Sequence, residues 1–425
     1  MGDNMIEKLT PEEFNEFSKN SNQGTFFQSS YWGELKSFTG WTHHMVGLKK
    51  DNKVVAATLL LGKKIPLLGK YIYYAPRGFL IDYHDNELLE LFVSGMKQYI
   101  KKNKGIFIKI NPYVEYRKRD INGDIMNDET NQSIIDKLID LGFAHNGFTI
   151  NYGIDLEPRW ISVLDLKGKT EEDILSNMRQ STRWRVNNSY KHGLELNEID
   201  ESRLPEFKKL MEHTGERRGF IDRPLSYYQK MYEAFKKDDN IKIMLVDLNI
   251  EDYLTNLKNQ KNELMLKIAE VKTKNMTTRN QNYLNELQTQ LKSLDERIEM
   301  LYILLETKGK VITVAGGLFM TFGKQVISLF GASYQEYMKF NGQYFLNFKM
   351  IKYALNNGFE KYNFYGITGE FNEDSPMFGL FDFKRGFNAE VVELIGEFTL
   401  VTRKLSYKVY RLMLKIYHKL KKRGK

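Results

Sequence analysis

The sequence predicts an α/β protein built from two similar units. A helical hairpin is inserted in the second unit, and an amphipathic helix follows at the C-terminal end. Three observations predict this fold class: a strand–strand–helix–strand order that occurs twice, two leucine-rich heptad stretches between its two occurrences, and a basic tail with regularly spaced apolar residues. With 425 residues, 42% of them hydrophobic, the chain can build ordinary cores, and its length favours two or three domains.

The first unit begins with an aliphatic run. Residues 54–61 (VVAATLLL) predict a buried strand, and a turn over residues 62–69 leads to a second strand at 71–74. Apolar residues at helical spacing predict a helix over 87–102, which Lys104-Gly105 ends before a strand at 106–110.

The second unit repeats this order. Strands at 311–317 and 326–330 flank a turn at Gly323-Lys324, a helix over 345–355 ends at Asn357-Gly358, and a strand follows at 362–365. Two short matches, KVV with KVI and KGIF with NGF, lie 257 and 253 residues apart. We interpret them as the trace of a duplication, with chance recurrence of a common pattern as the alternative.

Between the strands of the second unit lies a helical hairpin. Two stretches carry apolar residues at alternating steps of four and three, with Lys261 in one polar slot and a polar turn at 272–281. Such heptads predict an antiparallel coiled coil whose helices are each roughly 33–36 Å long. Two helices lying on a globular core are the alternative. The seam consists of Ile250, Leu254, Leu257, Leu264, Ile268 and Val271, then Leu284, Leu287, Leu291, Leu294, Ile298, Leu301 and Leu305.

The net charge of +9 resides in the tail. From Arg403 to Lys425 there are ten basic residues and no acidic one, which leaves 53 basic against 54 acidic residues elsewhere and excludes a globally basic coat for nucleic acid. One helical face is apolar, as expected of a helix lying on an anionic membrane surface. Contact with RNA and packing on the core are the alternatives. The face consists of Leu405, Val409, Leu412, Ile416 and Leu420, widened by Tyr410, Leu414 and Tyr417.

Several classes of protein are excluded by what the sequence lacks. Without cysteine there are no disulfides, thiolate metal sites or cysteine nucleophiles. We expect a cytoplasmic protein with peripheral membrane contact, because no signal-peptide core and no run of about 18–20 apolar residues occurs. HExxH, GxSxG, Walker and GxGxxG motifs are missing, so we expect neither a metal nor a cofactor.

Four stretches place polar or cationic groups among aromatic ones: FFQSSYWGELK (26–36), HTGERRGFIDRP (213–224), YNFYGITG (362–369) and LFDFKRGF (380–387). The arginines of the second stretch predict an anion-binding loop, because guanidinium groups fit phosphate and carboxylate; a surface charge cluster is the alternative. The Lys-Arg pair of the fourth stretch stands among phenylalanines. This composition is unusual for charged residues that are freely exposed to solvent.

In these stretches the chain resembles the Fem family (FemABX) of aminoacyltransferases that build peptidoglycan interpeptide bridges. The resemblance covers essentially the whole chain and includes IKINPYV, LFGAS, FDFKRGFNAEVVELIGEF and the inserted hairpin. It implies two tandem domains similar to GNAT acetyltransferases. These span residues 1–155, and 156–248 with 309–400; an arm at 249–308 and a tail helix at 401–425 complete the chain.

The resemblance implies an acyl transfer. The stem-peptide amine of a lipid-linked peptidoglycan precursor attacks the ester that joins an amino acid of the Gly, Ala or Ser class to tRNA. An ester is already activated, so positioning and stabilisation of the oxyanion suffice. The same fold with a lipid or a protein N-terminus as acceptor, or a non-catalytic membrane scaffold, stays open.

The resemblance also assigns roles to residues. Lys384 supplies the cation for the oxyanion, walled by Phe381, Phe383 and Phe387, in a lower dielectric than water. Asn111 stands where we associate an aspartate with the family and is given no catalytic role. Candidates for binding the precursor's phosphates are Lys36 and one of Arg217, Arg218 and Arg223, and those for binding its peptide are Tyr227, Tyr228 and Tyr365.

The arm is a candidate tRNA contact by the same resemblance. Its basic residues are interleaved with acidic ones, so a protein partner, either a related transferase or a second copy of the chain, is the alternative. The basic residues are Lys258, Lys261, Lys267, Lys272, Lys274 and Arg279. The amino acid transferred and its position in a bridge do not follow from the sequence.

Overall fold

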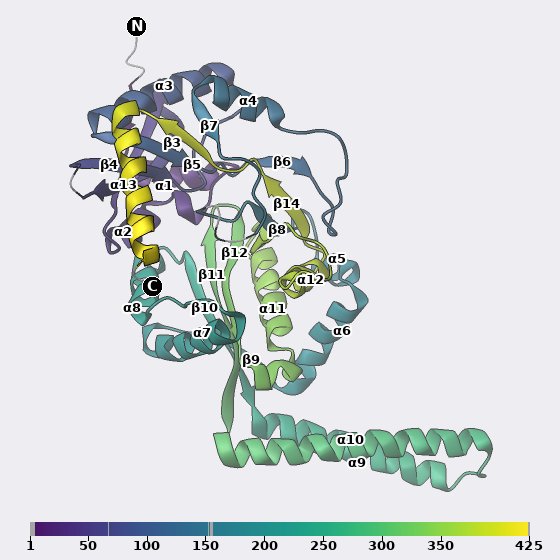
Figure 1. Cartoon of the computed structure of the whole chain (residues 1–425). Helices are drawn as coiled ribbons and strands as arrows, with labels where there is room; N and C mark the ends of the chain where they lie inside the picture. Colours follow the sequence, from purple (N-terminus) through teal and green to yellow (C-terminus); the bar gives the residue numbers. More distant parts are fainter. Residues whose placement is uncertain (1–4, 67, 152, 154–155, 424–425) are drawn as a thin grey trace.

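The computed structural model describes the chain except for residues 1–4, 67, 152, 154–155 and 424–425. Apart from a projecting arm, the chain forms a body that contains two β-sheets. The arm consists of two helices and projects from the end of the second sheet (Figure 1).

The first sheet has seven strands in the order β1-β2-β3-β4-β5-β15-β7. They are β1 (Glu7–Lys8), β2 (Thr42–Lys50), β3 (Lys53–Ile65), β4 (Lys70–Ala75), β5 (Gly105–Ile110), β15 (Phe398–Val401) and β7 (Phe143–His145). The helices of this unit are α1 (Pro11–Asn20), α2 (Ser30–Ser37), α3 (Asn86–Lys102) and α4 (Gln132–Asp140).

The second sheet has eight strands in the order β6-β14-β8-β13-β12-β11-β10-β9. They are β6 (Glu115–Lys118), β14 (Glu390–Leu394), β8 (Trp160–Asp165), β13 (Lys361–Ile367), β12 (Gln325–Ser333), β11 (Val311–Phe322), β10 (Ile241–Asn249) and β9 (Leu194–Glu198). Its helices are α5 (Glu171–Asn177), α6 (Gln180–Ser189), α7 (Leu204–Arg218), α8 (Leu225–Lys236), α11 (Gly342–Asn356) and α12 (Phe378–Gly386).

The predicted repeat is confirmed in the topology. In each unit three antiparallel strands are followed by a helix and a strand parallel to the third: β2-β3-β4-α3-β5 in the first and β10-β11-β12-α11-β13 in the second. The turn expected over residues 62–69 is shorter, because β3 extends to Ile65. The fold class is therefore the predicted one, α/β with two tandem units of the same strand order.

The sheets exchange two strands. β6, from the N-terminal part of the chain, pairs with β14 in the second sheet, and β15 lies between β5 and β7 in the first. Sheet membership thus departs from the proposed domain boundaries at residues 115–118 and 398–400. An apolar cluster also joins the units, with Phe27 and Leu59 of the first packed in one core with Phe207 and Leu318 of the second. The two units form one continuous body.

The arm consists of α9 (Ile250–Lys272) and α10 (Thr278–Lys308), which pack side by side and antiparallel (Figure 1). The predicted seam residues are buried or partly buried, and Lys261 in the polar slot pairs with Asp295 at 2.6 Å. The arm joins β10 to β11. The first unit makes the equivalent connection with a turn of two residues, Asp51 and Asn52, at φ 50° and 59°.

The tail forms α13 (Lys404–Arg423), which lies against the first sheet. Tyr407 and Tyr410 pack on Phe107 of β5, with ring centroids 5.3 and 5.5 Å apart. The prediction that Tyr410 widens the free apolar face was therefore wrong, because its ring completes a small core of the body. The side chains of Tyr417 and Leu420 are outside the described residues.

The remaining apolar face of α13 is free. Leu405 is 80% exposed, and Val409, Leu412 and Ile416 are each about half exposed or more. Within the described part of the chain, no helix is long and apolar enough to cross a membrane.

Candidate active site

The site begins where two parallel strands of the second sheet separate. β12 and β13 pair at Gln325–Lys361, Val326–Tyr362 and Ile327–Asn363, and the described ladder goes no further. β12 carries a β-bulge just beyond these pairs. Leu318 of β11 faces Phe330 of β12, whereas the next residue of β11, Phe319, faces Ser328. Where β12 and β13 separate, their backbone N–H and C=O groups need other hydrogen-bond partners.

Lys384 of α12 supplies such a partner. Its side chain is 5% exposed, and Nζ donates hydrogen bonds to the carbonyl oxygens of Tyr365 (3.2 Å) and Gly366 (2.6 Å) on β13. Tyr365 has φ 64°, a left-handed conformation that is costly for a tyrosine. The strand is thus bent at the point where the lysine binds it.

The Lys384 ammonium lies in apolar surroundings. No carboxylate forms an ion pair with it among the described residues, and burial lowers its pKa to about 7. The phenylalanines near it in the sequence are withdrawn from solvent: Phe381 and Phe387 are buried and Phe383 is partly buried. Of the three N–H groups of an ammonium, the described contacts use two, which leaves one for a substrate oxygen.

A second group of polar side chains lies on the other side of β13, around Glu157. The hydroxyl of Tyr365 donates to Glu157 Oε2 at 2.5 Å, and its ring stacks on Phe27. Burial raises the pKa of Glu157, and the neighbouring cations Arg77, Lys36 and Arg223 oppose that rise. Sequence reasoning missed Glu157, because it stands in a loop outside any motif.

Lys36 and Arg223 approach this group from different units. Nζ of Lys36 lies 4.5 Å from the centre of the Trp32 ring. Burial lowers the pKa of Lys36, while the Glu157 carboxylate raises it and Arg223 lowers it. Arg223 lies over the Tyr227 ring at 5.5 Å and forms no ion pair within the described residues. The two cations therefore converge beside one carboxylate.

Arg77, one of the cations next to Glu157, is held in place by Asn111. The backbone N–H of Arg77 donates to Asn111 Oδ1 at 2.7 Å, and its Nη2 donates to the Pro158 carbonyl at 2.7 Å. Arg77 also has a positive φ of 56°. Asn111 Oδ1 thus holds the backbone of Arg77 in place. Arg77 carried no recognisable signal in the sequence.

The other two arginine candidates lie elsewhere. Arg217 and Arg218 form the last turn of α7, so the predicted anion-binding loop begins only at Gly219. Arg217 Nη1 approaches Met338 Sδ at 3.6 Å, and Arg218 points to solvent. The structure therefore groups Arg223, and neither of these two, with Lys36.

The two tyrosine candidates also differ. Tyr227 is partly exposed beside Arg223, and burial raises its pKa to about 12. Tyr228 is fully buried, and its hydroxyl donates to Asp222 Oδ1 at 2.6 Å. Tyr228 packs in the core and holds the loop in place; it does not line a groove, contrary to our expectation.

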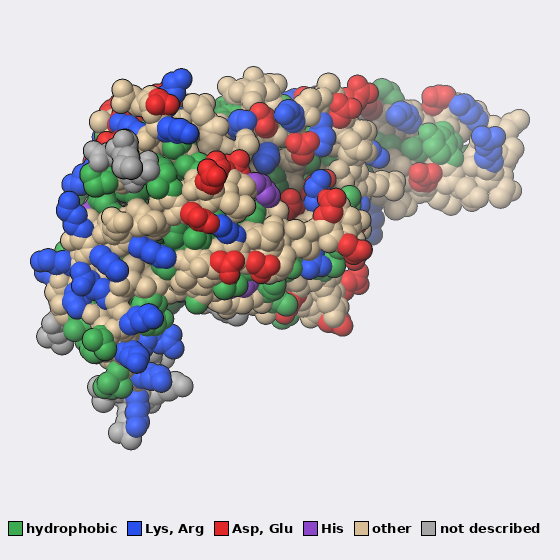
Figure 2. All heavy atoms as spheres, turned by 90° about the horizontal axis from the view of Figure 1, so that it is seen from above, with side chains coloured by type: hydrophobic (Ala, Val, Ile, Leu, Met, Phe, Trp, Pro, Cys, Tyr) green, Lys and Arg blue, Asp and Glu red, His purple; other side chains and the backbone are tan. Residues whose placement is uncertain are grey.

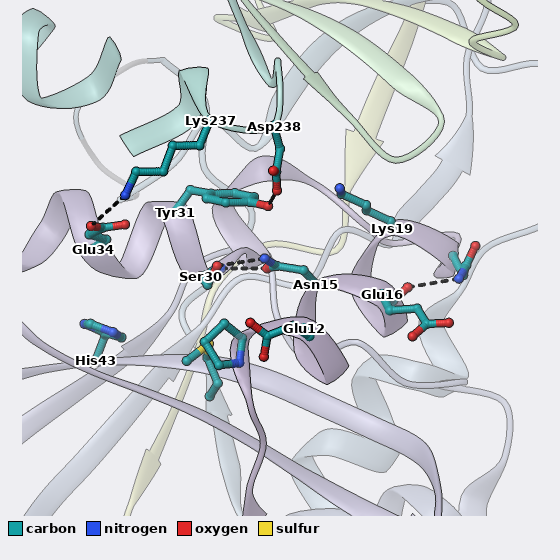
Figure 3. A pocket seen from close by; sticks show the side chains of 13 residues that line it. Glu12, Asn15, Glu16, Lys19, Ser30, Tyr31, Glu34, His43, Lys237 and Asp238 are labelled. Atoms are coloured by element: carbon teal, nitrogen blue, oxygen red, sulfur yellow. Dashed lines mark hydrogen bonds and ion pairs between the residues drawn. The ribbon is translucent and has the colours of Figure 1, made fainter. Parts of the chain in front are cut away.

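A separate pocket opens between α1, α2 and the segment after α8 (Figure 3). In it, the Tyr31 hydroxyl points to Asp238 and Lys237 points to Glu34. It contains none of the predicted site residues. Among the described residues, no cluster of His, Asp or Glu is arranged to hold a metal.

The buried Lys384 ammonium, with an N–H left for a substrate oxygen, is a group that can stabilise the oxyanion of an acyl transfer. The chain matches the family model FemAB family over residues 9–415, and it belongs to this family. It is 33% identical over 415 residues to "Aminoacyltransferase FemA" of Staphylococcus aureus strain bovine RF122 / ET3-1 and to that of strain N315. Each alignment covers 96% of this chain and 98% of the relative. The chain is therefore an aminoacyltransferase, as predicted.

A solved structure described as "Crystal structure of FemX" is similar over the whole body. Its TM-score is 0.80 at 28% identity, and the match covers 95% of this chain and 99% of that one.

Proposed function

We propose that the chain transfers an amino acid from aminoacyl-tRNA to the stem-peptide amine of a lipid-linked peptidoglycan precursor. Family membership supports the reaction class. The observation that carries the mechanism is the buried Lys384, whose ammonium is held by two carbonyls with one N–H left over.

In this reaction the amine nitrogen attacks the ester carbonyl carbon, and its C=O electrons move onto the oxygen. Lys384 donates a hydrogen bond to that oxyanion from a preorganised position in a dry environment, where a charge acts most strongly. The C–N bond forms, the C–O bond to the terminal ribose breaks, and the proton lost by the amine leaves with the ribose hydroxyl. Neither a nucleophilic side chain nor a metal is required.

In this proposal the acceptor binds on the Glu157 side of β13. Lys36 and Arg223 suit the precursor's phosphates, because Lys36 is partly exposed, Arg223 is exposed, and neither cation forms an ion pair within the described chain. Tyr227 beside Arg223 suits the peptide. Since the two cations come from different units, the phosphates would bridge the units.

The tail is assigned to the membrane that holds the precursor. The free stripe of Leu405, Val409, Leu412 and Ile416 follows the i, i+4, i+7, i+11 spacing of one helical face. Lysines and arginines surround it on the protruding end at the lower left of Figure 2. At about 1 kcal/mol per basic residue near an anionic surface, the tail is a useful anchor. The proposed location is the inner face of the plasma membrane.

The arm supports RNA binding less than its sequence suggests. Lys261 and Lys274 pair with Asp295 and Glu270, and these pairs reduce the charge available for phosphate. A protein partner, either a related transferase or a second copy, stays the alternative for the arm.

The proposed function is tested by an acceptor assay. The purified chain is given glycyl-, alanyl- and seryl-tRNA with lipid-linked precursor, and the mass of the stem peptide is measured. An increment of one of these residues supports the proposal. No transfer from any of the three contradicts it, and transfer to lipid or to a protein N-terminus instead supports the alternative acceptor.

A further inference from the structure

The helix α6 carries an unusual surface. Trp184 is 61% exposed, and its neighbours in the sequence are Arg183 and Arg185. From residue 174 to residue 194 the chain has four basic residues and no acidic one. A large indole left in solvent among cations is not explained by packing, because the buried face of α6 is formed by Thr182, Val186 and Ser189.

The two arginines are available for a ligand. Within the described residues neither forms an ion pair with a carboxylate. Arg183 donates only to backbone carbonyls of Leu175 and Ser176, and Arg185 lies over the Tyr344 ring at 5.3 Å. Two guanidinium groups without an acidic partner suit phosphates.

This surface is fixed to the element that carries Lys384. The backbone N–H of Arg179, at the start of α6, donates to the Gly386 carbonyl of α12 at 3.0 Å. The Arg179 guanidinium binds both carboxylate oxygens of Asp382 at 2.7 and 2.9 Å. Tyr344, beneath Arg185, packs on Phe383, next to Lys384. A ligand on α6 is thus held in a defined place relative to the catalytic lysine.

The strand β13 separates this surface from the acceptor groups. Successive side chains of a strand point to opposite faces, and here Phe364 packs with Phe383 and Phe387 of α12 while Tyr365 points to Glu157. The acceptor's cations lie on the Glu157 side. The side of α12 and α6 is therefore free for the other substrate. The ester from this side and the amine from the Glu157 side must meet at Lys384, where β12 and β13 separate.

We propose that Arg183, Trp184 and Arg185 bind the single-stranded 3′ end of the aminoacyl-tRNA. Trp184 stacks on a base and the arginines contact phosphates, the combination by which proteins hold single-stranded RNA without reading its sequence. The proposal rests on the proposed function, because the ester to be cleaved is at the RNA's terminal ribose. The nucleotides next to that ribose must then lie beside α12.

The test measures the affinity of an uncharged RNA hairpin that ends in the single-stranded 3′ tail of a tRNA, by fluorescence anisotropy. Trp184→Ala should weaken binding about tenfold, within the range for stacking on one base, and Trp184→Phe should restore most of it. Arg183→Gln with Arg185→Gln should lower the slope of log affinity against log salt by about 0.7 per lost phosphate contact. A hairpin without the 3′ tail should bind wild type and Trp184→Ala equally.

The matched control is Tyr302→Ala in the arm, another exposed aromatic with a lysine, Lys258, over its ring. Equal binding of the tailed hairpin by wild type and Trp184→Ala would overturn the proposal. So would a loss of binding by Trp184→Ala to the hairpin without the 3′ tail, because the effect would then not depend on that tail. If the wild-type chain binds this RNA but transfers no amino acid, the proposed function fails while the RNA surface stands. If it transfers an amino acid and Trp184→Ala binds normally, only the RNA surface fails.

Discussion

At the scale of single residues, the proposed mechanism depends on how Lys384 is held. Its phenylalanine neighbours could be read from the FDFKRGF stretch, and so could the low dielectric around it. The two carbonyls that bind Nζ could not, because they are presented by a left-handed Tyr365 where β13 leaves β12. Backbone conformations of this kind depend on tertiary packing and leave no signature in residue type.

The buried lysine gives stability a definite pH dependence. Burial holds the pKa of Lys384 at about 7 in the folded chain, below its usual 10.5. Between these values the unfolded chain binds one more proton, so raising the pH favours the folded state. Relative to Lys384→Met, the wild type should gain at most about 1.4 kcal/mol per pH unit above neutral. Denaturant unfolding of both proteins from neutral to alkaline pH measures this, and a constant difference would show that the lysine is not buried.

Glu157 should control the charge of Lys36. Its carboxylate raises the pKa of Lys36, so Glu157→Gln should lower that pKa further and weaken binding of the precursor's phosphates. The loss should be several-fold and should grow as the pH rises, because less Lys36 is then charged. Precursor affinity measured by calorimetry at neutral and alkaline pH tests this. Glu34→Gln is the control, because Glu34 is exposed and lies on the same helix as Lys36. An equal loss of precursor affinity in Glu34→Gln would refute the role of Glu157.

At the scale of elements, the arm was the most predictable part, because its heptad seam depends only on local periodicity. Its ends are close in space, since Asn249 pairs with Val311. Replacing residues 250–310 by Asn-Gly, a two-residue hairpin turn like that of the first unit, should leave the body folded. Circular dichroism should show the lost helix and a single unfolding transition at a lower thermal midpoint than wild type, because Ile250, Tyr253 and Leu254 at the base of α9 pack in the core of the body. Failure to fold would mean that the arm is part of the body.

The tail was predicted as a helix with a free apolar face, and the structure divides that face in two. Tyr410 packs on the body with Tyr407, whereas Leu405 and Leu412 stay exposed. Leu405→Asn with Leu412→Asn should therefore reduce binding to anionic vesicles at least tenfold without changing stability, since each removes apolar area that only lipid would bury. Sedimentation with vesicles measures it. Ile303→Asn in the arm, similarly exposed, is the control and should bind as wild type does.

At the scale of the molecule, the duplication was predictable and the joining of its halves was not. Each unit's strands and helices follow local patterns, but β6 and β15 are short and cross into the other sheet. For the same reason the sequence could not choose among three arginines. Arg217, Arg218 and Arg223 lie within seven residues of one another, and only the packing of one unit on the other brings Arg223 to Lys36.

This arrangement predicts that the precursor and the tRNA bind on different sides of β13, so that each can be weakened without the other. Arg223→Ala should raise the dissociation constant of the precursor, by roughly the 1.5–3 kcal/mol of a charged hydrogen bond, and should leave the affinity for tRNA unchanged. Arg218→Ala, exposed nearby, is the matched control. A larger loss in Arg218→Ala than in Arg223→Ala would contradict the grouping of Arg223 with Lys36.

The proposed mechanism requires that Lys384 stabilises the transition state and does not hold the precursor. The most direct measurement compares Lys384→Met with wild type in single-turnover transfer from aminoacyl-tRNA and in precursor binding by calorimetry. We predict that the transfer rate of Lys384→Met falls by at least about a hundredfold, as on removal of an oxyanion donor, while the precursor dissociation constant changes less than about threefold. An unchanged transfer rate, or a loss explained wholly by weaker precursor binding, would contradict it.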